Sequence, residues 1–264
     1  MKNPCHFPQR IICLTEESVE FLYAIGEEHR IIGVSAFVER PIQAKSLPRV
    51  CAFTSANITK IVEMKPDLVL GFSDIQKDIA RELIEAGVEV WIANHRSLDG
   101  VLSYCMKLGG LIGQPEKTQS YVDKLLLKIE ETRNAVQSLT RFKVYLEEWD
   151  EPMISGIQYF SELVSLCGGD NIFDSQASLA KDRFVNPKEV VRLNPEVIFG
   201  CWCGKKVDIE SILKRDGWDQ ITAVSKKQVF ELKPEVFLQP GPALIEDGID
   251  ILLEHFKKLR KASS

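Results

Sequence analysis

The sequence contains no apolar run approaching the roughly 18 residues that a membrane-spanning helix needs. Its N-terminus, MKNPCHFPQRIICLTEES, also lacks the apolar core and the small-residue cleavage site of a signal peptide. The 7 cysteines are odd in number and scattered, which is not the pattern of a disulfide framework. Together these absences predict a cytoplasmic protein. A periplasmic or extracellular location is the alternative if a leader has been removed.

An excess of positive charge is absent as well. The chain has 33 Lys and Arg residues against 38 Asp and Glu residues, and its formal net charge is −5. Nucleic acid and anionic membranes are therefore not expected as its main partners. With 264 residues, of which 45% are hydrophobic and 27% charged, the composition is that of a soluble globular protein large enough for two separate cores.

Catalytic motifs are also missing. The segment Gly200–Lys205 superficially resembles a phosphate-binding loop, but the spacing of its glycines is too short and Lys206 stands where Ser or Thr is required. There is no nucleophile elbow and no Ser-His-Asp order. The carboxylates between Glu147 and Glu151 are more simply a solvated loop than a catalytic pair. The sequence therefore predicts a protein that is not an enzyme.

The sequence does contain one long amphipathic stretch, from Pro115 to Leu139. Apolar residues recur there at helical spacing, and Pro115 takes the first-turn position that proline favours. As a helix this stretch would be about 37 Å long, which is enough to join two lobes. Residues 116–139 contain no proline or glycine, so the helix should resist bending and limit lobe closure to a few degrees.

The two halves of the chain on either side of this stretch resemble each other. Residues 57–71, NITKIVEMKPDLVLG, align without gaps on residues 186–200, NPKEVVRLNPEVIFG. Each copy predicts a capped helix, a turn and a short buried strand. The simplest architecture is an α/β fold with two Rossmann-like α/β lobes joined by one long backbone helix. We expect the N-terminal lobe at 8–113, the connecting helix at 114–140 and the C-terminal lobe at 141–260.

Aromatic residues follow the predicted strands in both halves. They are Phe37, Phe53, Phe72, Trp149, Tyr159, Trp202 and Phe237. Ligands of open α/β sheets bind beyond the carboxyl ends of the strands, so these side chains would line a cleft between the lobes that suits a large, flat, partly apolar ligand. Ordinary core packing is the alternative for each one alone. Two of them lie in segments expected to be irregular, Leu47–Asn57 and Glu148–Pro152.

A histidine and two cysteines are the remaining candidates. His95 follows a predicted strand, where it either forms local hydrogen bonds or contacts a ligand, with axial coordination of a ligand's metal as one form of contact. Cys201 and Cys203 form half of a thiolate metal site, but no second pair has a suitable spacing. Packing at the strand end is therefore the preferred interpretation of these thiols, and no resident metal site is predicted.

Several longer motifs resemble those of a known family. They are IIGVS followed by Phe37 and Pro41, IVEMKPDLVLG (61–71), LEEWDEPMISG (146–156), ELVSLCGGDNIF (162–173), NPKEVVRLNPEVIFGCWCG (186–204) and FLQPGPALIEDGIDIL (237–252). Over nearly its whole length the chain resembles the substrate-binding proteins in which a helical backbone links two α/β lobes. The W-D-x-P loop, the Cys-Gly after the second repeat strand and the PGP-x-L-x-x-DG ending most resemble the cobalamin-binding members.

The resemblance implies a protein that binds cobalamin or another corrinoid. It implies no catalytic residues. By position, Phe37 and Phe53 fall where cobalamin binders place aromatics against the corrin. Gln239 and Ser155 would meet the amide rim of the ligand. The ligand loops of the second lobe would supply Trp149, Tyr159, Trp202 and Phe237. An iron chelate, either a siderophore or haem, delivered to an ABC importer is the alternative.

One departure from the family concerns its membrane partner. Importing members resemble one another in presenting an acidic residue on each lobe's repeat helix, which meets arginines of the ABC transporter permease. The corresponding positions here are Thr59 and Lys188. Loss or reversal of charge at both positions would weaken such docking. The hypothesis is therefore a monomer that binds a corrinoid without serving the usual transporter.

Overall fold

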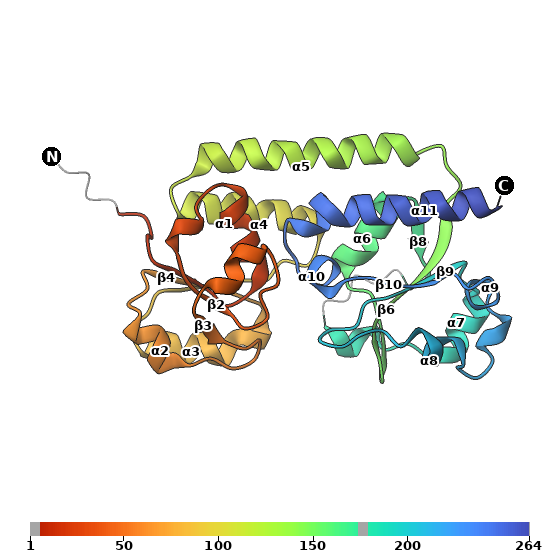
Figure 1. Cartoon of the computed structure of the whole chain (residues 1–264), viewed down its shortest axis with the longest axis horizontal. Helices are drawn as coiled ribbons and strands as arrows, with labels where there is room; N and C mark the ends of the chain where they lie inside the picture. Colours follow the sequence, from red (N-terminus) through yellow and green to blue (C-terminus); the bar gives the residue numbers. More distant parts are fainter. Residues whose placement is uncertain (1–5, 174–178, 264) are drawn as a thin grey trace. The chain divides into compact units, whose positions relative to one another are not determined.

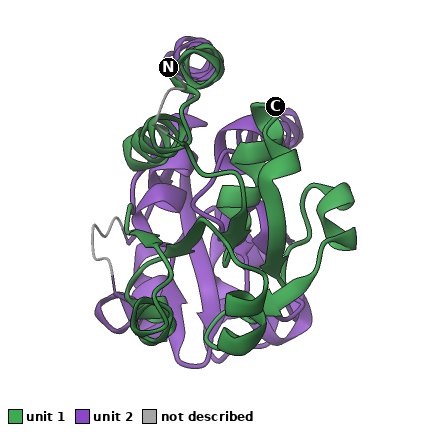
Figure 2. Ribbon diagram, turned by 90° about the vertical axis from the view of Figure 1, so that its left-hand side faces the viewer, with its two compact units in different colours: residues 1–95, 99–124 green, residues 96–98, 125–264 purple. Residues whose placement is uncertain are grey.

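The computed structural model describes residues 6–173 and 179–263. The chain divides into two compact units, which are drawn in different colours in Figure 2. Unit 1 comprises residues 1–95 and 99–124, and unit 2 comprises residues 96–98 and 125–264. Each unit contains a sheet with helices packed on it, so the expected α/β fold with two Rossmann-like lobes is confirmed. The lobe boundaries proposed from the sequence remain a prediction.

Unit 1 is built on a parallel sheet in the order β3-β2-β1-β4-β5. Its strands are β1 Ile11–Cys13, β2 Ile31–Ser35, β3 Arg49–Cys51, β4 Leu68–Phe72 and β5 Val90–Ala93. The order reverses between β1 and β4, and in open α/β sheets such a switch point is where ligands bind. Strand β3 lies inside Leu47–Asn57, so the prediction that this whole segment is irregular is wrong.

The helices of unit 1 pack on both faces of this sheet (Figure 1). They are α1 Glu16–Ala24, α2 Ile58–Glu63, α3 Lys77–Glu85 and α4 Leu98–Leu111, with short 3-10 turns η1 Glu28–Arg30, η2 Ile42–Ser46 and η3 Asp74–Gln76. The Asn57 side chain accepts the N–H of Lys60, so α2 begins with the predicted cap. Under α2 and α3, Ile61 and Leu83 pack on the sheet residues Ile12 and Val69.

Unit 2 has a mixed sheet in the order β10-β9-β6-β7, with β8 also paired to β6. Its strands are β6 Phe142–Asp150, β7 Met153–Ser155, β8 Gly169–Asn171, β9 Val197–Gly200 and β10 Val229–Glu231. Strands β6 and β7 form an antiparallel hairpin, while the other pairs are parallel. Part of the segment expected to be a loop, Glu148–Pro152, is therefore the end of β6.

Helices also accompany the strands of unit 2. They are α6 Gln158–Leu166, α7 Pro187–Leu193, α8 Ile209–Leu213, α9 Thr222–Ser225, α10 Pro234–Phe237 and α11 Ile249–Ser263, with 3-10 turns η4 Ala180–Arg183 and η5 Trp218–Gln220 and the π-helical turn η6 Leu244–Gly248. Asn186 accepts the N–H of Lys188 at the start of α7. The second repeat thus reproduces the capped helix and buried strand of the first. The segment expected to be irregular between Asp170 and Arg183 contains residues 174–178, which lie outside the described residues.

Helix α5, Pro115–Val136, begins in unit 1 and ends in unit 2 (Figure 1). It is the helix predicted from Pro115 to Leu139, and it ends three residues earlier. Within the predicted apolar stripe of this helix, Val122, Leu125 and Val136 are buried, and so is Thr132. Within the described residues, no helix is both long enough and apolar enough to cross a membrane.

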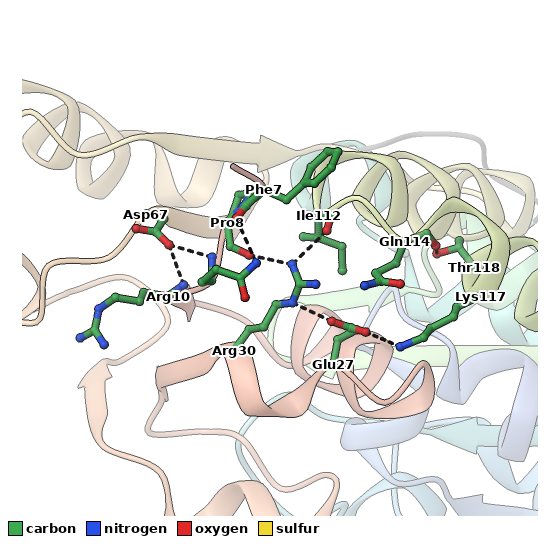
Figure 3. Close-up of polar contacts among 11 residues, drawn as sticks. Phe7, Pro8, Arg10, Glu27, Arg30, Asp67, Ile112, Gln114, Lys117 and Thr118 are labelled. Atoms are coloured by element: carbon green, nitrogen blue, oxygen red, sulfur yellow. Dashed lines mark hydrogen bonds and ion pairs between the residues drawn. The ribbon is translucent and has the colours of Figure 1, made fainter. Parts of the chain in front are cut away.

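At the amino edge of the unit 1 sheet, two buried charges and one exposed lysine form a group of ion pairs, shown in Figure 3. Glu27 precedes β2 and pairs with Arg30 at 2.6 Å and with Lys117 of α5 at 2.5 Å. Arg30 Nη1 donates to the carbonyl oxygens of Pro8 (2.7 Å) and Ile112 (2.9 Å). One guanidinium therefore ties the segment before β1, the turn before β2 and the end of α4 together.

Candidate functional site

The carboxyl edge of the unit 1 sheet presents two of the predicted aromatics on neighbouring strands. Phe37 lies in the turn after β2 and its side chain is 59% exposed. Phe53 follows β3, which pairs with β2, and is half-buried. These two rings come from adjacent strand ends, although the strand before Phe53 was not predicted. Exposed aromatics of this kind are suited to cover an apolar ligand face.

Phe72 and His95 pack into the same edge from the other side of the switch point. Phe72 ends β4 and is buried, and the imidazole of His95 after β5 meets it edge-on at 5.2 Å between ring centroids. The other face of His95 stacks on Tyr104 of α4 at 4.7 Å. His95 is thus held by ring packing on two sides, and its local hydrogen bonding stays a prediction. Its contact with a ligand stays a prediction.

Three glutamates at the same edge were not singled out from the sequence. Glu16, Glu17 and Glu20 lie on the first turns of α1, directly after β1, and are 3%, 1% and 9% exposed. Glu16 Oε1 accepts the backbone N–H groups of Glu39 (3.1 Å) and Arg40 (2.6 Å). Glu17 accepts the hydroxyl of Thr15, and Glu20 pairs with Arg40 at 2.7 Å.

Burial changes the acidity of two of these carboxyl groups. It raises the pKa of Glu16 to about 8, helped by the charge of Glu20 and opposed by the N–H groups of Arg40 and Glu39. It raises the pKa of Glu17 to about 7 against the hydrogen bond from Thr15. Shifts of this size gather at functional sites. The only local sign in the sequence is a TEES segment directly after a strand.

In unit 2, Trp149 and Trp202 lie around one lysine. Lys205 Nζ lies 4.3 Å from the ring centroid of Trp149 and 4.7 Å from that of Trp202, and it pairs with Asp150 at 2.6 Å. Trp149 is half-buried near the end of β6, and its Nε1 donates to the carbonyl oxygen of Glu151. Among the aromatics predicted for this unit, Trp149 is therefore the one that is partly exposed.

Trp202 is a core residue in this structure, with 2% of its surface exposed. Its Nε1 donates to Glu147 Oε1 at 3.2 Å. Glu147 is itself fully buried and forms a bidentate pair with Arg215, with distances of 2.5 and 2.9 Å. Trp202 thus packs beneath the surface of the strand-end loop. The Trp202 side chain would have to move in order to contact a ligand.

Three further predicted residues of unit 2 are buried. The Tyr159 hydroxyl donates to the carbonyl oxygen of Leu238 at 3.0 Å, and Ser155 Oγ donates to that of Arg183 at 3.4 Å. Phe237 is 0% exposed and packs on Phe160 with 5.4 Å between ring centroids. The side chains of these residues contact other residues of their own unit, and their contact with a ligand stays a prediction. Gln239, in contrast, is half-buried in the loop after α10.

The two strand-end cysteines do not form a metal site. Cys201 is buried and its N–H donates to the carbonyl oxygen of Glu147 at 2.8 Å, while Cys203 is exposed. Burial raises the pKa of both thiols, and for Cys201 the rise is large. A raised pKa disfavours the thiolate that metals require. Among the described residues, no group of three His, Cys, Asp or Glu side chains could hold a metal ion.

Comparison with known proteins places the chain in a family. A model of the periplasmic binding protein family matches residues 11–236. The chain belongs to this family. Its members bind ligands and do not catalyse reactions, so the prediction that the protein is not an enzyme agrees with its family.

Individual relatives cover nearly the whole chain. An ABC transporter substrate-binding lipoprotein of Bacillus subtilis is 26% identical over 257 residues, which is 94% of this chain and 79% of that protein. The vitamin B12-binding protein of Vibrio cholerae is 26% identical over 261 residues, which is 97% of this chain and 92% of that protein.

Solved structures show the same fold. The periplasmic vitamin B12-binding protein of Vibrio cholerae superposes with a TM-score of 0.76 at 25% identity, covering 97% of this chain and 100% of that chain. A periplasmic heme-binding protein of Pseudomonas aeruginosa gives a TM-score of 0.81 at 19% identity, covering 94% and 92%. The second likeness shows the fold alone.

These relatives correct the predicted location. The cytoplasmic assignment rested on the N-terminal sequence and the odd number of cysteines. It is wrong, because the relatives include a lipoprotein and a periplasmic vitamin B12-binding protein. The cysteines are also explained without reference to a compartment, since Cys13, Cys51, Cys105, Cys167 and Cys201 are buried and pack as small apolar side chains.

Proposed function

We propose that this family member binds a cobalamin or a related corrinoid as the substrate-binding protein of an ABC importer. The observation that carries the proposal is made in each unit by itself: exposed or half-buried aromatic side chains lie at the carboxyl edge of its sheet, Phe37 and Phe53 in unit 1 and Trp149 in unit 2. The full-length similarity to the Vibrio vitamin B12-binding protein supports the same ligand class.

The chemistry of a corrinoid suits these residues. A corrin ring has a broad apolar face on which exposed aromatics of either unit can stack, and its rim of amides can exchange hydrogen bonds with side-chain amides such as Gln239 and with backbone groups. In this proposal Phe72 and His95 support the edge of unit 1. The buried residues of unit 2 support its loops, namely Ser155, Tyr159, Trp202 and Phe237.

An iron chelate or haem is the second candidate ligand. A heme-binding protein shares the fold, and cations stand near the strand-end loops of both units. However, Arg40 is paired with Glu20 at 2.7 Å, and Arg183 is paired with Glu148 at 2.5 Å. Cations that are already neutralised offer little to an anionic chelate. The charge pattern therefore supports the corrinoid over the chelate.

The relatives also bear on location and partner. We propose that the protein works outside the cytoplasmic membrane and delivers its ligand to a permease. Thr59 on α2 and Lys188 on α7 are both exposed. A permease that meets them should lack the paired arginines that acidic positions require, because like charges across an interface weaken binding.

The proposal is tested by titrating the purified protein with cyano-, hydroxo- and adenosylcobalamin. The visible spectrum and the heat of binding are followed, with haemin and a ferric siderophore as competing candidates. Saturable one-to-one binding of a cobalamin supports the proposal. A change in the cobalt absorption bands would indicate a protein ligand such as His95. Binding of haemin or siderophore alone would replace the corrinoid by the second candidate.

A further inference from the structure

The turn that presents Phe37 is anchored in two different ways along its length. Its first half follows the sheet, because Ala36 N–H donates to the carbonyl oxygen of Cys51 at 2.7 Å and Val38 N–H to that of Ser35 at 3.3 Å. Its second half leaves the sheet. There the N–H groups of Glu39 and Arg40 donate to one carboxylate oxygen, Glu16 Oε1, at 3.1 and 2.6 Å.

Helix α1 holds the same two residues through a second side chain. Glu20 lies one helical turn after Glu16 and therefore on the same face of α1. It accepts Arg40 Nε at 2.7 Å. The backbone and the side chain of Arg40 are thus both bound to α1. The exposed ring of Phe37 projects from a turn whose far end is fixed by carboxyl groups.

The charge of Glu16 is controlled by the groups that surround it. Glu20 faces it from its own helix, and Arg40 faces it from the turn. Burial raises its pKa to about 8, so near neutral pH it is mostly the neutral acid. Its Oε1 then acts as a carbonyl acceptor for two N–H groups. A glutamine at this position would keep that acceptor and the neutral charge.

We propose that Glu16 is a positioning residue for ligand binding, which holds the turn of residues 36–41 so that Phe37 is presented to the ligand. The inference rests on the proposed function, because it requires Phe37 to contact the ligand. Glu16 itself need not touch the ligand. Its side chain is 3% exposed and its hydrogen bonds go to the backbone of the turn.

Cobalamin affinity is measured for Glu16→Leu, Glu16→Gln, Phe37→Ala and the double variant Glu16→Leu/Phe37→Ala. Glu16→Leu should weaken binding roughly tenfold because the turn loses two hydrogen bonds. Glu16→Gln should stay within about threefold of the unaltered protein. In the Phe37→Ala background, Glu16→Leu should cause no further loss, because Glu16 acts only through Phe37.

The matched control is Glu17→Leu, which removes an equally buried carboxyl group from the position next to Glu16 on α1. Glu17 accepts the hydroxyl of Thr15, and among the described residues it makes no hydrogen bond to the turn of residues 36–41. Its removal should leave the affinity of the folded protein unchanged. If Glu16→Leu fails to fold, Arg40→Met loosens the same turn from Glu20 with little change in the core. It should weaken binding roughly threefold.

Hydrogen exchange of the Glu39 and Arg40 amides tests the anchoring without any ligand. Both should exchange faster in Glu16→Leu, and neither should change in Glu17→Leu. Unchanged exchange, or a loss of affinity that adds to that of Phe37→Ala, would overturn the positioning role. If the unaltered protein binds no corrinoid, the proposed function and the positioning role both fail. The exchange result would then describe only how α1 holds the turn.

Discussion

The two edges of the unit 1 sheet treat buried carboxyl groups in opposite ways. At the amino edge, Glu27 is 2% exposed and is paired with two cations, Arg30 and Lys117 (Figure 3). Burial opposes its ionisation, but Lys117 and Arg30 outweigh burial and lower its pKa. At the carboxyl edge, burial prevails and the pKa values of Glu16 and Glu17 are raised.

The difference follows from what each edge contributes. The amino edge joins the chain before β1 to the ends of α4 and α5, and ion pairs with matched hydrogen bonds make that junction rigid. Glu27 Oε2, Glu16 Oε2 and Glu17 Oε2 all lack a hydrogen-bond partner among the described residues, but Glu27 Oε2 lies 2.6 Å from Arg30 Nε in an ion pair. Burial without a close cation favours the neutral form of a carboxyl group. The comparison therefore separates an edge held by ion pairs from an edge whose buried carboxyl groups have raised pKa values.

Removal of Arg30 should have the largest effect on stability. Arg30→Leu leaves Glu27 without one of its cations and two carbonyl oxygens without their donor. Breaking such a buried pair typically costs about 3–5 kcal/mol. The free energy of unfolding, measured with urea, reports the loss. The control is Arg81→Leu, which breaks the exposed pair between Arg81 and Asp78 and should cost less than about 1 kcal/mol. Equal losses in the two variants would contradict a stabilising amino edge.

Replacement of the glutamates at the two edges should change the pH dependence of stability in opposite directions. Between about pH 4.5 and 8, folded Glu16 keeps a proton that the unfolded chain releases, so stability falls as the pH rises, by at most about 1.4 kcal/mol per pH unit. Glu16→Gln should remove this fall and gain relative stability at pH 8.

Glu27 has the opposite sign because its pKa is lowered. Its contribution is present above the ordinary carboxyl range and is lost as the pH falls through its folded-state pKa. Glu27→Gln should therefore be most destabilising at neutral pH and less so in acid. Urea unfolding at several pH values measures both effects. Parallel pH profiles for Glu16→Gln and the unaltered protein would mean that Glu16 is not a buried acid.

The sequence predicted the fold well where the signals are local. In each repeat, the asparagine cap (Asn57 or Asn186) and the buried strand that follows it lie within one segment of 15 residues. Both caps and both strands form as expected. The hairpin of β6 and β7 was missed, because the polar residues and proline between Glu148 and Pro152 are typical of a loop.

The candidate site was harder to predict because burial depends on distant partners. Phe37 and Phe237 are both aromatics near strand-end loops, but one is 59% and the other 0% exposed. Phe237 is covered by Phe160, which precedes it by many residues and gives no local signal. Glu16 and Glu17 were missed for the same reason. Their burial comes from the turn after β2 and from helix packing, and nothing in their neighbours indicates it.

Truncation of Phe37 should separate binding from stability at the carboxyl edge. Phe37→Ala should weaken cobalamin binding about tenfold, as loss of an aromatic anchor does, with little change in the free energy of unfolding, since the ring is exposed. Ile84→Ala is the control, because Ile84 is 61% exposed on α3 and stands just before β5, near the amino edge. A similar loss of affinity in both variants would show that exposure alone is responsible.

Lys205 tests whether the carboxyl edge of unit 2 follows the same rule. Its charge is satisfied by Asp150 and by the rings of Trp149 and Trp202, so this edge resembles the amino edge of unit 1 in its pairing, although it is more exposed. Burial acts to raise the pKa of Asp150, but the hydrogen bond and charge of Lys205 outweigh it, so the pKa is lowered overall. Lys205→Met should cost no more than about 1 kcal/mol at neutral pH, because the pair is partly exposed and screened by solvent.

The loss in Lys205→Met should shrink in high salt and as the pH falls toward the range where Asp150 takes up a proton. Tryptophan fluorescence should also change, because the cation leaves the rings of Trp149 and Trp202. Lys205→Arg keeps the charge and the ring contact and serves as the control. A salt-independent loss above about 2 kcal/mol would instead mean that Lys205 stabilises through packing of its alkyl chain. In that case, the ion pair of Lys205 would not be what makes the carboxyl edge of unit 2 different from the carboxyl edge of unit 1.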